Sequence, residues 1–116
     1  MNSSNFEQGE IVVAPIPFAG FSDTKIRPAL VISAGGYNQK SEDVIVLKIT
    51  SKFKEYPLDV TLKSGDLTAG ELRQESVIQT DFPVVIEKRS ITQTIGKISN
   101  QKLSEVKQKI RELYAL

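Results

Sequence analysis

Short β-branched runs between turn-forming segments constrain the fold of this chain more than any other feature. Residues 28–33, "PALVIS", and 43–50, "DVIVLKIT", are continuous apolar runs with turn signals on both sides. Runs of this length that are rich in Ile and Val favour buried strands over helices. Residues 10–18 form a similar run, but Pro15 and Pro17 limit its ladder bonding, and proline is tolerated at a sheet edge or a bulge.

Two further strands are predicted downstream. Residues 57–62 alternate with a period of two, so that Leu58, Val60 and Leu62 share one face. Residues 76–82 form another strand, and Pro83 is expected to end it. The segments 19–26, 33–42 and 63–75 are predicted to be loops because they are rich in turn residues, and 33–42 is expected to be a flexible connection.

The last part of the chain changes period. Apolar residues at 103, 106, 110 and 113 lie on one face of a helix, and Ser99 is a suitable N-cap. Ile98 and Leu103 fit the two positions of a hydrophobic staple. The chain is therefore predicted to be mainly β with helices (α+β), a mostly antiparallel barrel-like sheet closed by a C-terminal helix. It is expected to form a single domain over residues 1–116, because no linker or repeat divides it.

Two missing residue types limit the chemistry. The 116 residues include no cysteine, which excludes disulfides and thiolate catalysis, and no histidine, the usual general base near neutral pH. A net charge of +1 allows a polyanion to bind only through a local patch. No apolar run approaches the ~20 residues of a membrane-spanning helix, and residues 1–5 lack a signal pattern. We expect a soluble, cytoplasmic protein without membrane association.

Five motifs in a fixed order carry a family resemblance. "GEIVVAPIPF", "RPALVIS", "DVIVLKITSK", "SVIQTD" and "IGKIS" before a terminal helix resemble the MazF/PemK toxins of toxin–antitoxin pairs over residues 8–113. The resemblance implies an SH3-like small barrel of the CcdB/PemK/MazF type and a homodimer. It also implies an mRNA interferase, a sequence-specific endoribonuclease that cleaves single-stranded RNA without metal or another cofactor. A cognate antitoxin protein is expected to neutralise it.

The same resemblance assigns two catalytic residues, Arg27 and Thr50. A guanidinium is always protonated and binds phosphate oxygens through two parallel donors, which suits charge stabilisation in phosphoryl chemistry. A threonine hydroxyl can hold another phosphate oxygen or orient the attacking group. Two plainer interpretations stay open: Arg27 as an exposed strand-end cation paired with Asp23 or Asp43, and Thr50 as a β-branched residue that suits a strand end.

Eight further residues are predicted to contact RNA. They lie in the loop before Arg27, directly after Thr50 and on the strand 76–82: Phe21, Ser22, Asp23, Lys25, Ser51, Lys52, Gln79 and Asp81. An unpaired base could stack on the Phe21 ring, and Gln79 could read a base edge. Lys52 as a solvated charge and Asp81 as a turn residue are the plainer alternatives. Some family members carry a basic residue shortly after the acid, where this chain has two valines, so the general base and acid stay unassigned.

Two other functions remain open from the sequence. The related CcdB-type toxins share the barrel but inhibit DNA gyrase by binding, without catalysis. A small SH3-like interaction module with no activity is the third interpretation. The pair Arg27 and Thr50 favours the nuclease.

Overall fold

The computed structural model describes residues 5–17, 24–52 and 57–116. Its elements follow one another as β1 (Glu10–Pro17), β2 (Thr24–Val31), α1 (Gly35–Lys40), β3 (Asp43–Thr50), β4 (Asp59–Leu62), η1 (Ser64–Asp66), β5 (Leu67–Gly70), β6 (Ser76–Glu87), η2 (Lys88–Ser90), β7 (Gln93–Ile98) and α2 (Asn100–Tyr114). No helix among the described residues is long and apolar enough to cross a membrane.

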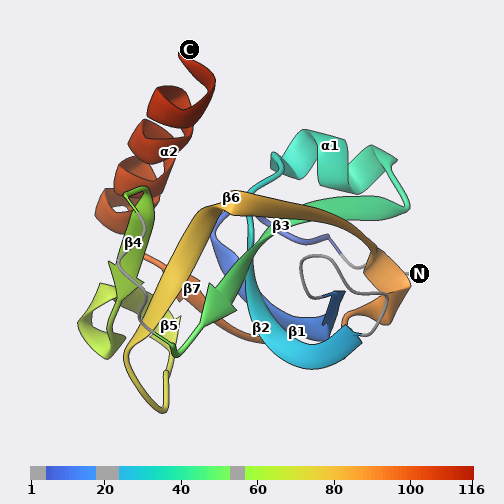
Figure 1. Ribbon diagram of the computed structural model, residues 1–116. Helices are drawn as coiled ribbons and strands as arrows, with labels where there is room; N and C mark the ends of the chain where they lie inside the picture. Colours follow the sequence, from blue (N-terminus) through green and yellow to red (C-terminus); the bar gives the residue numbers. More distant parts are fainter. Residues whose placement is uncertain (1–4, 18–23, 53–56) are drawn as a thin grey trace.

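Seven strands form one sheet in the order β4-β6-β3-β2-β1-β7-β5, and every neighbouring pair is antiparallel. The sheet curls on itself, and α1 and α2 lie on different sides of it (Figure 1). The predicted fold class, mainly β with a barrel-like sheet and a C-terminal helix, is therefore confirmed.

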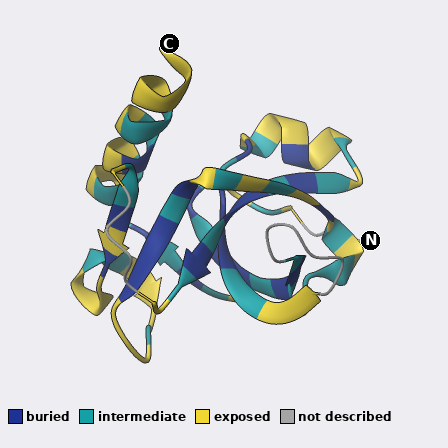
Figure 2. Cartoon of the chain, viewed as in Figure 1, coloured by how far each residue is buried: buried dark blue, intermediate teal, exposed yellow. Residues whose placement is uncertain are grey.

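Because side chains alternate along a strand, the sheet buries apolar residues on both faces. One core lies under α2 and includes Ile11, Leu30, Leu47 and Val106. The other lies inside the curl of β1, β2, β3 and β6 and includes Val12, Ala29, Val46 and Ile86. Figure 2 shows the buried residues, in dark blue, along the central strands that lie between the two cores. The central strands are thus held from both sides, which fixes the direction of each of their side chains.

The strand prolines lie where their strands have only one described neighbour. Pro15 and Pro17 pair with β2, but the pairing of β1 with β7 ends at Val13. Pro28 pairs with β1, and the pairing of β2 with β3 begins one residue later. Pro83 pairs with β3, beyond the end of β4. Since proline has no N–H to donate, each strand can continue through it at such a one-sided position.

The C-terminal helix begins as predicted. The Ser99 hydroxyl accepts a hydrogen bond from the Lys102 N–H at 3.1 Å, which confirms the N-cap. Val106 is buried, and Leu103 and Ile110 pack against the same core as Ile98. Leu113, the last residue of the predicted face, is 37% exposed. The apolar stripe therefore continues past the part of the helix that the sheet covers.

Four sequence predictions were wrong. Residues 33–42 are not a flexible connection but contain α1, and 63–75 contain η1 and β5. The loop 19–26 ends early, because β2 already begins at Thr24. The strand that was expected to stop at Pro83 continues to Glu87, because the one-sided pairing just described tolerates proline there.

Candidate active site

Arg27 and Thr50 lie on neighbouring strands and on the same face. β2 and β3 pair from Val31–Val46 to Ala29–Lys48, and Arg27 and Thr50 each lie two residues beyond this last pair, on the same face as Ala29 and Lys48. Directly opposed residues of an antiparallel pair project to the same face. Arg27 is half-buried, and Thr50 is half-buried. The topology thus places a guanidinium and a hydroxyl together at one end of the inner face.

The register also excludes one plainer interpretation of Arg27. Asp43 opposes Glu87 at the other end of β3, about 23 Å along the strand from Thr50. An ion pair between Arg27 and Asp43 is therefore out of reach. The other partner considered, Asp23, lies outside the described residues.

The Thr50 hydroxyl is oriented by the chain that follows it. Its Oγ1 accepts a hydrogen bond from the Lys52 N–H at 3.2 Å. A hydroxyl that accepts in this way keeps its O–H as a donor, which can point to an anionic oxygen. Ser51 and Lys52, both predicted to contact RNA, are exposed at the same end of β3.

Lys48 is a candidate that sequence reasoning missed. It shares the face of Thr50, two residues earlier on β3, and opposes Ala29, two residues after Arg27. Its Nζ lies 4.7 Å from the centre of the Phe82 ring, within the range of a cation–π contact. Alternation along 43–50 could have placed Lys48 on the side of Thr50, but only the register brings both next to Arg27.

β6 carries a three-residue irregularity beside this site. Leu47 opposes Pro83, whereas Ile49 opposes Ile78, so β6 contains extra residues between these two pairs. Gln79 opposes Asp59 of β4 and shares the face of Thr50, because Val77 is the partner of Thr50. The Oε1 atom of Gln79 is buried and accepts no hydrogen bond from the described residues. Asp81 lies within the irregularity and is exposed.

The remaining predicted RNA contacts precede Arg27. Lys25 is exposed at the start of β2, on the same face as Arg27. Phe21, Ser22 and Asp23 lie outside the described residues, so their predicted contacts stay predictions. The described structure therefore gathers Lys25, Arg27, Thr50 and Gln79 on one face, with Ser51 and Lys52 at its end and Asp81 at its margin.

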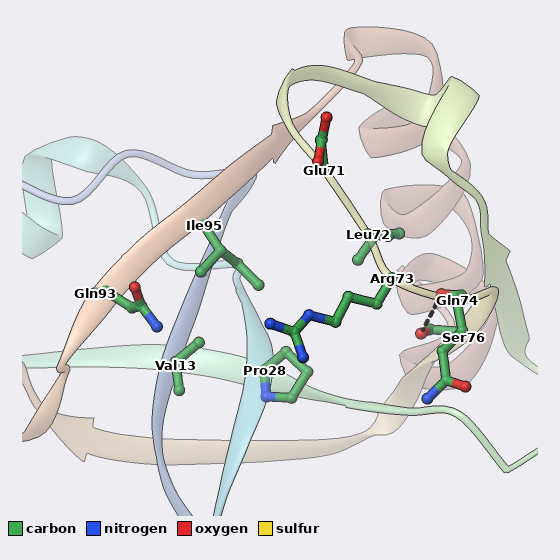
Figure 3. Close-up of a pocket in the computed structure, with 9 residues that line it drawn as sticks. All are labelled: Val13, Pro28, Glu71, Leu72, Arg73, Gln74, Ser76, Gln93 and Ile95. Carbon is green, nitrogen blue, oxygen red and sulfur yellow. Dashed lines mark hydrogen bonds between the residues drawn. The ribbon is translucent and has the colours of Figure 1, made fainter.

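A cavity of about 430 Å³ lies on the opposite face of the sheet, on the side of the core under α2. It lies between β1, β2, β7 and the segment 71–76, and its lining residues are Val13, Pro28, Glu71, Leu72, Arg73, Gln74, Ser76, Gln93 and Ile95 (Figure 3). Pro28 directly follows Arg27, and Ser76 directly precedes Val77, the partner of Thr50. Because side chains alternate along a strand, Pro28 and Ser76 project to the face opposite to Arg27 and Thr50, and the sheet lies between the cavity and the candidate pair.

Within 5–17, 24–52 and 57–116, no group of three or more Asp or Glu side chains is arranged to hold a metal ion.

Comparison with known proteins identifies the family of this chain. The family model of PemK-like, MazF-like toxins of type II toxin–antitoxin systems matches residues 7–114. No protein with a curated description matches the sequence significantly.

Solved structures match over almost the whole chain. A structure of MazF from Deinococcus radiodurans is 27% identical, with 98% of this chain and 100% of that chain covered and a TM-score of 0.79. A MazE–MazF structure from the same organism is also 27% identical, with 98% and 99% covered and a TM-score of 0.76. An endoribonuclease from a mycobacterial species shares the fold, at 13% identity, coverage of 97% and 94%, and a TM-score of 0.78.

Proposed function

The chain belongs to the PemK-like, MazF-like toxins of type II toxin–antitoxin systems, and on that premise we propose that it is a sequence-specific endoribonuclease of single-stranded mRNA. The single observation that carries the proposal is the placement of Arg27 and Thr50 on one face of neighbouring strands. Residues 1–116 then form one toxin domain.

The proposed reaction is an internal transfer at phosphorus. The ribose 2′-oxygen forms a bond to the adjacent phosphorus while the bond to the 5′-oxygen breaks, which leaves a 2′,3′-cyclic phosphate and a free 5′-hydroxyl. The 2′-proton is lost and the leaving 5′-oxygen gains one. Arg27 stabilises the charge that develops on the phosphorane-like transition state, and the Thr50 O–H donates to another phosphate oxygen.

Positioning and electrostatics carry this chemistry in a chain without histidine. The guanidinium stays protonated at any relevant pH. Because Arg27 is half-buried, water screens its charge less than on an open surface. Lys25, Ser51 and Lys52 supply further donors along the strand ends, and Gln79 and Asp81 are placed to contact bases or phosphates. These roles make one RNA-binding strip across β2, β3 and β6.

The test of the proposed function is cleavage of a long single-stranded RNA by purified protein in EDTA, with the fragment ends mapped. We expect discrete cuts that carry 5′-hydroxyl ends and that persist in the chelator. A folded protein that makes no cuts, or one whose cuts disappear with EDTA, contradicts the metal-independent mechanism.

Replacing Thr50 by alanine is expected to slow cleavage by at least ~10-fold, because the hydroxyl is proposed to contact the transition state. Single-turnover rates on one short RNA that contains the mapped site measure the effect. The matched control is Thr68→Ala, at an exposed position on β5. A Thr50→Ala rate within twofold of wild type removes this hydroxyl from the mechanism.

Lys48 is proposed to contact a phosphate next to the scissile one. Lys48→Gln then removes one charge from the interface, so the slope of log K against log salt for a single-stranded RNA becomes shallower by about 0.7. A fully 2′-O-methylated RNA keeps the substrate intact during the titration. Lys40→Gln, at the exposed end of α1, is the control and keeps the wild-type slope. Equal slopes for wild type and Lys48→Gln place Lys48 outside the interface.

A cognate antitoxin and a homodimer complete the proposal. The MazE–MazF structures from Deinococcus radiodurans are of a toxin with its MazE partner at 26–27% identity to this chain. An acidic, disordered antitoxin segment suits the cations Lys25, Arg27 and Lys52, and its binding should weaken with salt. A two-fold dimer is the commonest soluble assembly and would align two RNA-binding strips. RNA cleavage and its neutralisation by the antitoxin would both take place in the cytoplasm, where mRNA is available.

One observation keeps a second candidate function open. Past Ile110 the apolar residues lose their cover, with Tyr114 at the end of α2 56% exposed and Leu116 beyond it 85% exposed. A non-catalytic toxin of the CcdB type would use such an exposed helix end to bind its target. A folded wild-type protein that cuts no RNA but binds DNA gyrase would favour this candidate. One that does neither would favour an inactive interaction module.

A further inference from the structure

The outer face of β1 and β2 carries an apolar strip that is open to solvent at one end. The strip consists of two neighbouring residue pairs of these strands, Val13–Pro28 and Pro15–Ile26. Because side chains alternate along a strand, the four side chains project to the same face as Leu30 of the core under α2. Leu30 is fully buried, whereas Ile26 is 63% exposed. The sheet thus continues its apolar face beyond the core, and a contiguous apolar patch of this kind is typical of an interaction site.

The cavity of about 430 Å³ adjoins this apolar strip. Val13 and Pro28 belong to both the strip and the cavity lining, and the half-buried side chains of Leu72 and Ile95 add two further apolar walls (Figure 3). The strip and the cavity therefore form one continuous apolar surface with a hollow at one end.

Two charged residues stand on either side of Leu72 at this hollow. Glu71 and Arg73 are both exposed, and both line the cavity. Figure 3 shows Glu71 at the rim and the Arg73 side chain reaching toward the Pro28 ring. Neither side chain forms an ion pair or a hydrogen bond with any residue that the structure describes. The apolar surface is thus bordered by one anion and one cation that a partner can pair.

The backbone that carries these two charges is held in place. The Ser76 hydroxyl donates to the Gln74 carbonyl at 3.2 Å, and the Ser64 hydroxyl donates to the Leu72 carbonyl at 3.2 Å. These hydrogen bonds fix the chain on both sides of Arg73. A surface that is already ordered loses less entropy when a partner docks on it.

The balance of charge indicates the kind of partner that fits. RNA or an acidic antitoxin segment is a polyanion, and on this surface it would meet the like charge of Glu71. A second copy of the chain brings one anion and one cation of its own. In a two-fold contact residue i of one copy meets residue j of the other, and j meets i. An axis near Leu72 therefore sets Arg73 of each copy opposite Glu71 of the other.

We propose that the apolar strip and the adjoining cavity form the surface on which a second copy of the chain docks, around a two-fold axis near Leu72. The inference rests on the homodimer in the proposed function and adds the surface through which that dimer forms. Arg27 and Thr50 project to the opposite face of the sheet. Docking here therefore leaves the RNA-binding strip of each copy open.

The experiment is a charge swap, with the dimer dissociation constant measured by analytical ultracentrifugation over a series of protein concentrations. We expect wild type to dimerise. Arg73→Glu and Glu71→Arg each replace two attractive pairs by two repulsive ones, so each should raise the dissociation constant by about 10-fold or more. The double variant restores opposite charges in exchanged positions, so its dissociation constant should return to within about threefold of wild type.

A second variant tests the apolar strip. Ile26→Asp would bury an unpaired charge in the contact, so it should also raise the dissociation constant by about 10-fold or more. The matched control is Val85→Asp, at a residue that is 62% exposed and pairs with Ile45, toward the other end of β3 from Thr50. The control for charge reversal is Arg89→Glu, at an exposed guanidinium that pairs with Glu87 at 3.0 Å. Both controls should dimerise like wild type, and circular dichroism checks that every variant is folded.

Four results would overturn the proposal. Wild-type dissociation constants in both single charge variants place the dimer contact elsewhere. Weakening that the double variant does not reverse means that Arg73 and Glu71 do not face each other across a two-fold axis. Equal weakening in Arg89→Glu means that any charge reversal has this effect. An unchanged dimer with weaker binding of a labelled oligoglutamate peptide in Arg73→Glu means that the surface binds an acidic peptide instead.

RNA cleavage by the same samples separates this proposal from the nuclease assignment. A wild-type protein that cuts RNA but stays monomeric at every concentration rejects the docking surface and the homodimer, and it leaves the nuclease in place. A dimer that responds to the charge swap as expected but cuts no RNA supports the docking surface, in which case the nuclease assignment alone fails.

Discussion

Arg27→Ala is expected to reduce the rate of RNA cleavage by at least about 100-fold while the protein stays folded. The proposed role of the guanidinium is to stabilise charge that exists only in the transition state, and removing one such donor from an enzyme costs on the order of 10²–10³ in kcat. The fold should survive because Arg27 lies at the one-sided end of β2 and is half-buried, outside both apolar cores. Single-turnover cleavage and the thermal unfolding midpoint measure the two expectations separately.

The matched control is Arg89→Ala. Arg89 belongs to η2, is 85% exposed and follows the end of β6 that pairs with Asp43, at the far end of β3 from Thr50. The same side chain is thus removed without touching the candidate site, and the rate should stay within twofold of wild type. Equal rates for Arg27→Ala and wild type would falsify the assignment of Arg27.

Leu47→Ala is expected to lower the free energy of unfolding by about 2–5 kcal/mol. Leu47 is 1% exposed in the core under α2, and it pairs with Leu30 of β2 and with Pro83 of β6. Its removal leaves a cavity that strands paired on both edges cannot close easily. Urea unfolding followed by far-UV circular dichroism measures the change in the midpoint.

Leu116→Ala makes the same chemical change at a residue that is 85% exposed. We expect the control to stay within about 0.5 kcal/mol of wild type, as surface substitutions usually do. A loss below 1 kcal/mol in Leu47→Ala would mean that the two cores do not hold β3 as the structure describes.

The sequence predicted those parts of the fold that local pattern determines. The runs at 28–33 and 43–50 were correctly expected to be strands because their length and β-branching are local properties. The capped helix after Ser99 was also predicted, since its cap, staple and apolar spacing all lie within a few turns.

The elements that were missed depend on contacts between distant residues. α1 has six residues and begins with two glycines, which are weak helix formers. Its Asn38 is buried and donates from Nδ2 to the Phe6 carbonyl at 2.9 Å, and the Asn38 carbonyl accepts from Lys88 Nζ at 2.6 Å. Among the described strands, β5 pairs with β7 alone, nearly thirty residues later. No local pattern reveals partners at such distances.

The candidate site was also predicted only in part, because some of its features depend on contacts between distant residues. Arg27 and Thr50 could be named from the family motifs, but their common face follows from the pairing of β2 with β3. Lys48 was missed, because its place beside Phe82 and on the face of Arg27 depends on the pairing of β3 with its neighbours.

The prolines at the one-sided strand ends also determine how a partner can approach. Along β1, the backbone N–H groups that do not bond to β2 point to the other edge of the strand, where the pairing with β7 ends at Val13. At positions 15 and 17 this edge has no N–H, because both residues are prolines. This length of β1 therefore presents carbonyl oxygens without alternating donors, and an incoming peptide cannot complete a two-way ladder along it. A partner that reaches this edge of the barrel would therefore be held through its side chains rather than through a backbone ladder.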